Sequence, residues 1–211
     1  AIEFDVWLSA EKVPVIIHDG NCKRTCGIDS HVNNMNIAQI KTLTAHYPEK
    51  FGNQYACMNV TIPTLEELLI LRNAKRPDLL LGVEIKEYTE ECVDRTVDLL
   101  KKYGVFNMCF FYAFDANIIK YLYTKYNART MGYPDFQMRN YQPDSYSYYK
   151  ELGLDIKYVR SEIFPIYKAK NIPIHMYCAD NEEAVKLCMK MGADLITAND
   201  PIPLLTVLGR I

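Results

Sequence analysis

The chain alternates between short apolar runs and amphipathic helical stretches along almost its whole length. Residues 79–85, for example, form a nearly unbroken apolar run, and residues 89–103 follow with helical periodicity. When strands and helices alternate in this way, successive strands pair in parallel through right-handed crossovers. The pattern therefore predicts an α/β fold built around a largely parallel sheet.

Two α/β architectures fit this alternation. Strands that are followed by a helix make about seven βα units, one short of the eight that close a (β/α)8 barrel. An open doubly wound sheet usually carries a glycine-rich phosphate loop after its first strand, and the chain has neither a GxGxxG nor a P-loop motif. We therefore predict a TIM (β/α)8-type barrel, with one βα unit fewer than the eight that close it.

The same patterns predict individual elements. Thr64 and Glu67 form a capping-box pair before a leucine-rich stretch, and Gly192 stands at the C′ position of a later helix. The Tyr-rich segment 141–149 is expected to be a surface loop that enters a helix. The predicted strands cover residues 2–7, 13–17, 79–85, 107–113, 128–133, 156–159, 172–178 and 195–197, and the predicted helices start at 64 and cover 89–103, 116–126, 144–152, 162–170, 181–191 and 201–208.

The composition narrows the function classes. Of 211 residues, 49% are hydrophobic and 24% are charged, as in a compact domain. The formal net charge of -2, with both signs interspersed, gives no footprint for nucleic acid or for an anionic membrane surface.

The 7 cysteines include no CxxC pair, so we expect free thiols in a reducing compartment rather than a disulfide framework or a zinc finger. We expect a cytoplasmic location, because the chain shows neither a membrane span nor the basic start of a signal peptide.

Charged residues stand at the ends of two predicted strands. Glu3 and Asp5 are two residues apart and therefore share one face of a strand, as do Glu84 and Lys86 in GVEIKEY. If the two strands are neighbours in a barrel, three carboxylates converge at the C-terminal mouth, where barrel active sites lie. Such a group needs a cation, and all-oxygen ligation suits Mg²⁺ or Ca²⁺. The sequence thus predicts a divalent-cation site at Glu3, Asp5 and Glu84.

His18 follows the second strand of the predicted hairpin and is expected near that ion, where an imidazole can donate or accept a proton. Lys86 adds a positive charge. Together, a cation, a lysine and a histidine suit an anionic substrate whose reaction develops further negative charge, which indicates phosphoryl chemistry. A single strand carboxylate more often lies on a solvated edge, and a lone histidine is more often structural. The coincidence of these residues at strand ends favours the functional interpretation.

Several segments resemble a known family. EFDVWLS, VPVIIHD, the Arg-Thr of NCKRTCG, IPTLEELL and VEIK resemble, in this order, motifs of the glycerophosphodiester phosphodiesterases, which are metal-dependent TIM barrels. Residues 172–201 resemble the last two units of that family, so the similarity extends from Ala1 to about Pro201. The resemblance implies a small-molecule glycerophosphodiester substrate, which is hydrolysed to glycerol 3-phosphate and an alcohol.

The resemblance also implies roles for individual residues. Glu3, Asp5 and Glu84 match the metal-binding carboxylates of the family, and His18 matches one of its two catalytic histidines. Lys86 matches a lysine near the phosphate. Tyr177 stands where the family commonly has Trp, so it is expected on the glycerol or head-group side of the pocket.

One family motif is missing. The first strand of the family ends in His-Arg-Gly, which supplies the second catalytic histidine and a phosphate-binding arginine. None of His31, His46 and His175 matches that motif, and His175 falls inside a predicted strand, which favours a core histidine. The missing motif and the missing eighth strand are therefore the same deficit, and the resemblance implies that the first βα unit is absent from this chain. We expect residues 1–211 to form an N-terminally truncated domain of this family, with weak or no activity alone because half of the acid/base pair is absent.

Two alternatives remain open. A phospholipase D-type toxin resembles the same barrel and metal site but cleaves sphingomyelin or lysophospholipids. Those toxins are secreted and disulfide-bonded, whereas these cysteines show no framework. A catalytically retired barrel used for binding or scaffolding would turn over neither glycerophosphocholine nor glycerophosphoethanolamine. The sequence predicts no particular oligomeric state.

Overall fold

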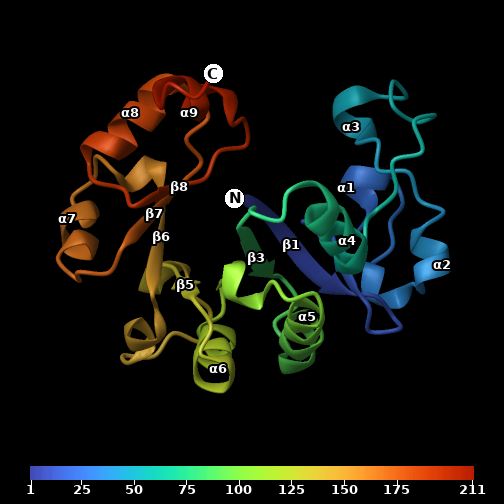
Figure 1. The fold of residues 1–211 in the computed structure, drawn as a ribbon, viewed down its shortest axis with the longest axis horizontal. Helices are drawn as coiled ribbons and strands as arrows, with labels where there is room; N and C mark the ends of the chain where they lie inside the picture. The colour runs from blue at the N-terminus through green and yellow to red at the C-terminus, as the bar shows by residue number, and fades with distance from the viewer. The chain divides into compact units, whose positions relative to one another are not determined.

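A computed structural model describes residues 1–211. They fall into two compact units, the first made of residues 1–113 and 124–128 and the second of residues 114–123 and 129–211. Figure 1 shows the elements of both units along the chain. Each unit is built from parallel strands with helices between them.

The first unit is organised around a sheet with the strand order β2-β1-β3-β4. Strand β1 (Ile2–Leu8) pairs in parallel with β3 (Leu81–Ile85), which pairs in parallel with β4 (Cys109–Tyr112). Strand β2 (Pro14–Ile16) turns back antiparallel to β1 and completes the predicted hairpin. In this register Asp5 of β1 lies directly beside Glu84 of β3.

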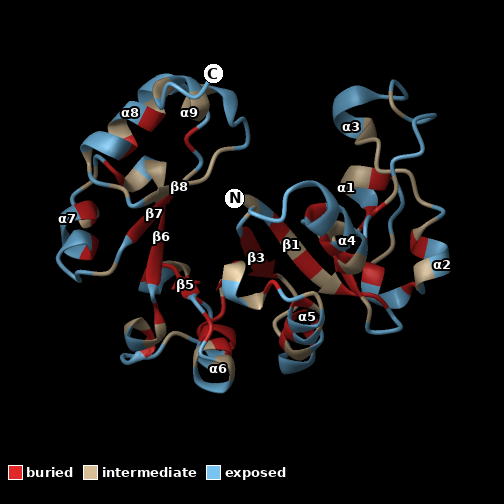
Figure 2. Cartoon of the chain, in the orientation of Figure 1, coloured by how far each residue is buried: buried red, intermediate tan, exposed pale blue.

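The burial of β1 follows the period of two that a strand imposes. Phe4, Val6 and Leu8 are buried on one face, whereas Glu3 and Asp5 alternate with them and share the other face. Strand β3 is buried along its whole length, as Figure 2 shows, and this includes the side chain of its glutamate. The sheet therefore positions two carboxylate-bearing strands side by side within an otherwise apolar unit.

Helices α4 (Leu65–Lys75) and α5 (Glu90–Lys102) precede and follow β3. The predicted capping box of α4 is formed, because the N–H of Glu67 donates to Thr64 Oγ1 (3.2 Å) and the N–H of Thr64 donates to Glu67 Oε2 (2.7 Å). The segment between β2 and α4 contains the short helices α1 (Lys23–Cys26), α2 (Ile37–Ile40) and α3 (Pro48–Phe51). It encloses a small core of its own: Val15, Ile17, Cys22, Cys26, Val32, Met35, Ile40 and Ile62.

The second unit contains the strand order β5-β6-β7-β8, with every neighbouring pair parallel. Most of α6 belongs to it, and α7, α8 and α9 follow β6, β7 and β8. Strands and helices here are β5 (Thr130–Gly132), β6 (Glu151–Asp155), β7 (Ile174–Tyr177), β8 (Leu195–Ile196), α6 (Ala116–Tyr126), α7 (Ile163–Lys168), α8 (Glu182–Lys190) and α9 (Ile202–Val207).

Two predicted elements of the second unit are wrong. Residues 144–152, predicted as a helix, form a 3-10 turn at Ser145–Tyr148 and then enter β6, and residues 156–159, predicted as a strand, form a 3-10 turn at Ile156–Tyr158. Gly153 weakens the strand pattern of β6, yet a β-carbon there would lie 2.6 Å from the Tyr133 ring, so the packing requires glycine. The other predicted elements are observed with bounds within about two residues.

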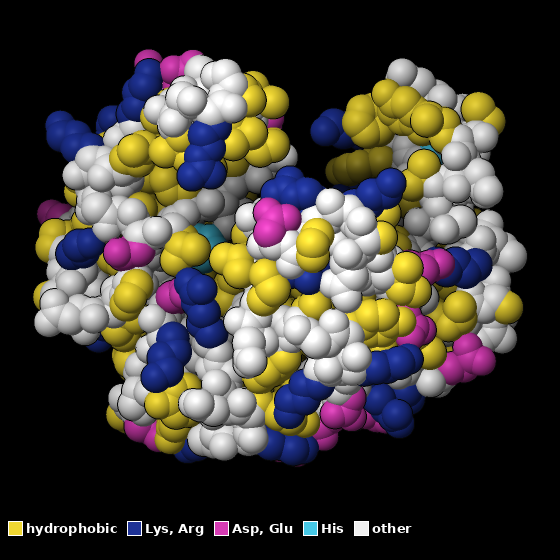
Figure 3. Space-filling model, in the orientation of Figure 1, with side chains coloured by type: hydrophobic (Ala, Val, Ile, Leu, Met, Phe, Trp, Pro, Cys, Tyr) yellow, Lys and Arg dark blue, Asp and Glu magenta, His cyan; other side chains and the backbone are white.

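The surface carries mixed charge, and Figure 3 shows Lys and Arg interspersed with Asp and Glu. Hydrophobic side chains gather over α3 in that view, where Phe51 is 39% exposed. None of the cysteines is joined to another by a disulfide bond. None of the helices combines the length and the apolar composition needed to cross a bilayer.

Candidate active site

Three carboxylates converge on one face of the first unit. Asp5 and Glu84 are paired positions of β1 and β3, and Glu3 precedes Asp5 by one strand period on the same face. One carboxylate oxygen from each residue lies within 4.8 Å of the others. The side chain of Asp5 is 13% exposed and that of Glu84 is 8% exposed, whereas Glu3 is exposed. The structure thus brings together the three acidic residues singled out from the sequence.

Lys86 is the cation that contacts this cluster. Its Nζ lies 2.7 Å from Glu84 Oε1 and 3.3 Å from Asp5 Oδ1, and its side chain is 15% exposed. The same two carboxylate oxygens are buried and accept no hydrogen bond of normal geometry. The N–H of Lys86 donates to the carbonyl of Val6 (3.1 Å), so the backbone that carries this lysine is attached to β1.

The pKa values in the cluster are shifted because three carboxylates share a single lysine. Burial raises the pKa of Glu84 to about 7; the ammonium of Lys86 acts against this rise, and the charges of Asp5 and Glu3 add to it. Burial and the charge of Asp5 also raise the pKa of Glu3, while a hydrogen bond with Tyr112 lowers it. Burial disfavours the charge on Lys86, but Glu84 and Asp5 outweigh it and raise the pKa of this lysine.

These residues fit a hard divalent cation. Three carboxylates against one ammonium leave a formal charge of about -2 in a largely buried site, which a divalent ion would offset. The donor set consists of oxygen alone, which suits Mg²⁺ or Ca²⁺ better than zinc or copper. Each of the three carboxylates offers one oxygen to such an ion, and these three oxygens lie within 4.8 Å of one another.

His18 follows the hairpin and returns toward the carboxylates. The N–H of Ile17 donates to the carbonyl of Asp5 (3.1 Å), and Trp7 Nε1 donates to the carbonyl of His18 (3.2 Å), so the backbone around His18 is tied to β1 on both sides. His18 is near enough for its charge to lower the pKa of Glu3, although burial has the larger effect. Its ring is 61% exposed and its Nδ1 lies 2.6 Å from Asp19 Oδ1.

Tyr177 lies in the second unit, at the end of β7. Its ring makes an edge contact with Tyr133 at a centroid distance of 5.7 Å, and Tyr133 stacks on Phe114 at 3.7 Å. Burial raises the pKa of Tyr177 to about 12, against a hydrogen bond with Gln137. His175 is 3% exposed in β7, which confirms the prediction of a core histidine.

Sequence reasoning assigned no site role to three residues that contact the predicted site residues or their partners. Tyr112 of β4 is the register partner of Glu84, and it bonds to Glu3. Asp19 contacts His18, and Arg24 contacts Asp19. The periodicity of β4 could have indicated Tyr112. Side chains alternate between the two faces of a strand, and this alternation places Tyr112 on the same face as the carboxylates. No periodic pattern predicts the contact between Asp19 and Arg24, which lie in an irregular segment.

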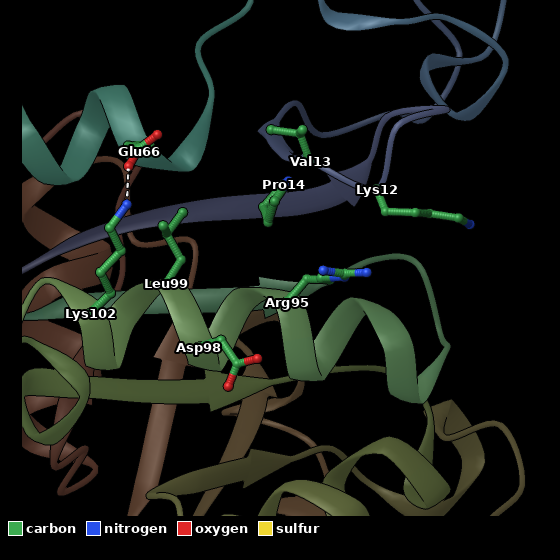
Figure 4. Close-up of a pocket in the computed structure, with 8 residues that line it drawn as sticks. All are labelled: Lys12, Val13, Pro14, Glu66, Arg95, Asp98, Leu99 and Lys102. Atoms are coloured by element: carbon green, nitrogen blue, oxygen red, sulfur yellow. Dashed lines mark hydrogen bonds and ion pairs between the residues drawn. The ribbon is translucent and has the colours of Figure 1, made fainter.

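A separate pocket of about 280 Å³ lies elsewhere in the first unit and shares no residue with the carboxylate cluster. Figure 4 shows that Val13, Pro14 and Leu99 line it together with charged side chains. Two of its cations are already neutralised, since Lys102 pairs with Glu66 and Lys12 pairs with Glu91. This pocket therefore offers no concentrated charge for an anionic substrate.

Comparison with protein families establishes which family the chain belongs to. The model of the glycerophosphoryl diester phosphodiesterase family matches residues 1–202. The chain belongs to this family. Members of the family are phosphoric diester hydrolases. YqiK of Bacillus subtilis strain 168 is 27% identical over 107 residues, and the matched segment covers 49% of this chain and 42% of YqiK, less than half of that protein.

Solved structures show the fold of this family member. An Oleispira antarctica phosphodiesterase in complex with its product sn-glycerol-3-phosphate has a TM-score of 0.82 at 20% identity, covering 98% of this chain and 84% of that one. The glycerophosphodiester phosphodiesterase of Agrobacterium tumefaciens C58 has a TM-score of 0.74 at 19% identity, covering 98% and 86%. These similarities confirm the predicted TIM-barrel-type α/β fold.

Proposed function

We propose that the full gene product hydrolyses glycerophosphodiesters to sn-glycerol 3-phosphate and an alcohol, in a reaction that depends on a divalent cation held by Glu3, Asp5 and Glu84. The observation that carries the proposal is the cluster of three carboxylate oxygens within 4.8 Å of one another, with one lysine between two of them. Family membership supports the reaction class, and the product complex of the Oleispira antarctica relative supports a small-molecule substrate of this kind.

The cation, when bound, would offset the carboxylates and stabilise negative charge that develops on phosphoryl oxygens. The other steps belong to side chains of this chain. Lys86 provides a fixed positive charge at the edge of the carboxylate cluster, where it attracts and orients a phosphodiester. His18 exchanges a proton through Nε2 of its ring, while Nδ1 contacts Asp19.

Tyr177 is the residue we propose for the alcohol or glycerol moiety of the substrate. Its ring is held by the edge contact with Tyr133, and Tyr133 is fixed in turn by stacking on Phe114. An aromatic wall of this kind provides apolar area with a polar hydroxyl at one end, which suits an alcohol. Replacement of Tyr177 by Ala is therefore expected to raise KM more than it lowers kcat.

A direct assay tests the proposed reaction. The full gene product is incubated with glycerophosphocholine and with glycerophosphoethanolamine, in Mg²⁺, in Ca²⁺ or in EDTA, and released sn-glycerol 3-phosphate is measured. We expect product with at least one substrate, loss of activity in EDTA, and recovery when the cation is restored. Glu84→Gln is expected to abolish turnover, whereas Glu183→Gln, at an exposed position of α8, keeps it.

Lysophosphatidylcholine and sphingomyelin serve as comparison substrates in the same assay. Turnover of these lipids without turnover of the glycerophosphodiesters would replace the proposal by a phospholipase D-type activity. Full activity in EDTA would refute the dependence on a cation. Absence of turnover of any substrate by a folded, cation-loaded protein would leave a barrel that binds without catalysis.

A further inference from the structure

Outside the carboxylates, a chain of polar contacts ends on His18. Asp19 Oδ1 lies 2.6 Å from His18 Nδ1, and Arg24 Nε donates to Asp19 Oδ2 at 2.5 Å. The two oxygens of one carboxylate therefore serve two different partners. Arg24 is in turn placed against Tyr47, with its Cζ 5.3 Å from the centroid of the ring.

The backbone fixes the positions of these side chains more firmly than their exposure suggests. His18 and Asp19 lie between Ile17 and Cys22, which are both buried in the small core of this segment. Arg24 lies on α1, whose last residue, Cys26, is 5% exposed in the same core. The helix ends at Gly27 with φ of 73°, a left-handed conformation that favours glycine.

Tyr47 adds a second anchor for Arg24. Its N–H donates to the carbonyl of Thr25 (2.8 Å), so the start of α3 is attached directly to α1. The hydrogen bond with Asp19, with a smaller contribution from Tyr47, raises the pKa of Arg24. Asp19 responds in the opposite sense, because the Arg24 guanidinium lowers the pKa of that carboxyl to about 2. Asp19 is therefore an anion throughout the neutral range.

An anionic acceptor at Nδ1 determines which ring nitrogen of the neutral imidazole carries the proton. A neutral histidine bears one N–H, and the hydrogen bond made by one ring nitrogen decides which nitrogen is protonated. A carboxylate accepts hydrogen bonds and cannot donate one when ionised, so the proton resides on Nδ1. Nε2 is then left as the unprotonated nitrogen, with its lone pair available.

We propose that Asp19 is a positioning residue for His18: held by Arg24, it fixes the imidazole in the orientation and tautomer that expose an unprotonated Nε2 to the substrate. This inference rests on the proposed function only in assigning proton exchange to His18. The orientation and the tautomer are properties of the chain itself and can be measured without substrate.

Nitrogen NMR of the imidazoles tests the tautomer directly. The protein contains 4 histidines, so a sample labelled with ¹⁵N-histidine gives a small set of ring signals, and His18→Gln identifies those of His18. We expect a protonated Nδ1 and an unprotonated Nε2 for neutral His18 in the wild type. Asp19→Ala is expected to remove this bias, whereas Asp29→Ala keeps it, since Asp29 lies on the other side of α1 and pairs with Lys23 and Asn21.

Steady-state kinetics test whether the positioning of His18 matters for turnover. For Asp19→Ala we expect kcat to fall on the order of 10²-fold with little change in KM, less than the ~10⁴-fold loss caused by altering a fully buried orienting aspartate, because His18 and Asp19 are partly exposed. Asp19→Asn, which preserves shape, provides a second variant should the alanine variant fold poorly. Arg24→Gln is expected to produce a smaller loss of the same kind, since Asp19 keeps its charge.

The possible outcomes distinguish the positioning role of Asp19 from the proposed function. A wild-type His18 protonated on Nε2, or an Asp19→Ala variant with an unchanged tautomer, would overturn the positioning role even if the protein hydrolyses its substrate. A changed tautomer with unchanged kcat would overturn it as well, because positioning would then not matter to the reaction. If the wild type shows no turnover while its tautomer is as expected and responds to Asp19→Ala, the proposed function fails and the control of His18 by Asp19 stands.

Discussion

The proposed cation site makes a quantitative prediction about thermal stability. A cation that binds only the folded chain adds about 2.7 kcal/mol to the free energy of unfolding at 100 times its Kd. For a chain of 150–250 residues each kcal/mol raises Tm by about 2–4 °C, so saturating Mg²⁺ or Ca²⁺ should raise Tm by roughly 5–11 °C. The perturbation is Glu84→Gln, which removes one carboxylate and leaves a neutral side chain of nearly the same shape.

Loss of one ligand and one charge should weaken binding at least as much as the 10–100-fold typical of lost outer-shell partners. With a 100-fold weaker Kd, the same cation concentration adds only about 0.4 kcal/mol, roughly 1–2 °C in Tm. In EDTA the variant should melt no lower than wild type, because the repulsion with Asp5 and Glu3 is relieved while Lys86 keeps its contact with Asp5.

Differential scanning calorimetry in EDTA and in increasing cation provides the measurement. Glu183→Gln is the matched control, since it makes the same chemical change at an exposed position and should keep the full rise in Tm. An undiminished rise in Glu84→Gln would show that the cation binds elsewhere. A wild-type Tm that no divalent cation moves would refute the assignment of Glu3, Asp5 and Glu84 as ligands.

Three further predictions concern stability. Burial, assisted by the charge of Arg129, lowers the pKa of His175 to about 4; the unfolded chain therefore binds more protons as pH falls from about 6.5 to 4, and stability should drop by up to about 3 kcal/mol over that window. Urea unfolding at several pH values should show this slope in wild type and a flatter one in His175→Gln, and equal slopes would contradict the assignment. Thr64→Ala removes one side of the capping box and should cost about 1 kcal/mol in the free energy of unfolding, so an unchanged denaturation midpoint would argue against the cap. Gly153→Ala places a β-carbon 2.6 Å from the Tyr133 ring and should cost about 1–3 kcal/mol, and a neutral effect in the same unfolding assay would mean that the ring moves freely.

Much of the fold was predictable because its pattern is periodic. Alternation of apolar runs and amphipathic helices indicated parallel strands, and Thr64 with Glu67 marked the start of α4. The failure at β6 has a physical cause, since Gly153 is unfavourable in a strand by itself and is required only because the Tyr133 ring occupies its side-chain space. Tertiary packing of this kind leaves no periodic signal in the sequence.

The same distinction, between residues with a periodic pattern and residues brought together by packing, applies to the candidate site. Glu3, Asp5 and Glu84 were found from strand periodicity, because carboxylates at the same face of neighbouring strands must meet once the register aligns them. Asp19 and Arg24 meet only because the irregular segment after β2 folds around its own small core. Their contact depends on that packing, and spacing along the chain does not predict it.

Burial of a charge does not by itself distinguish a functional site in this protein. Glu151 of β6 and Glu84 of β3 are both buried, and burial raises the pKa of both carboxyls. Glu151 is matched by the guanidinium of Arg129, one charge against one, as a structural ion pair requires. Glu84 instead shares a single lysine with a second carboxylate and lies near a third. An unbalanced excess of like charge has no structural advantage, so the imbalance, rather than the burial, is the observation that supports the carboxylate cluster as the proposed cation site.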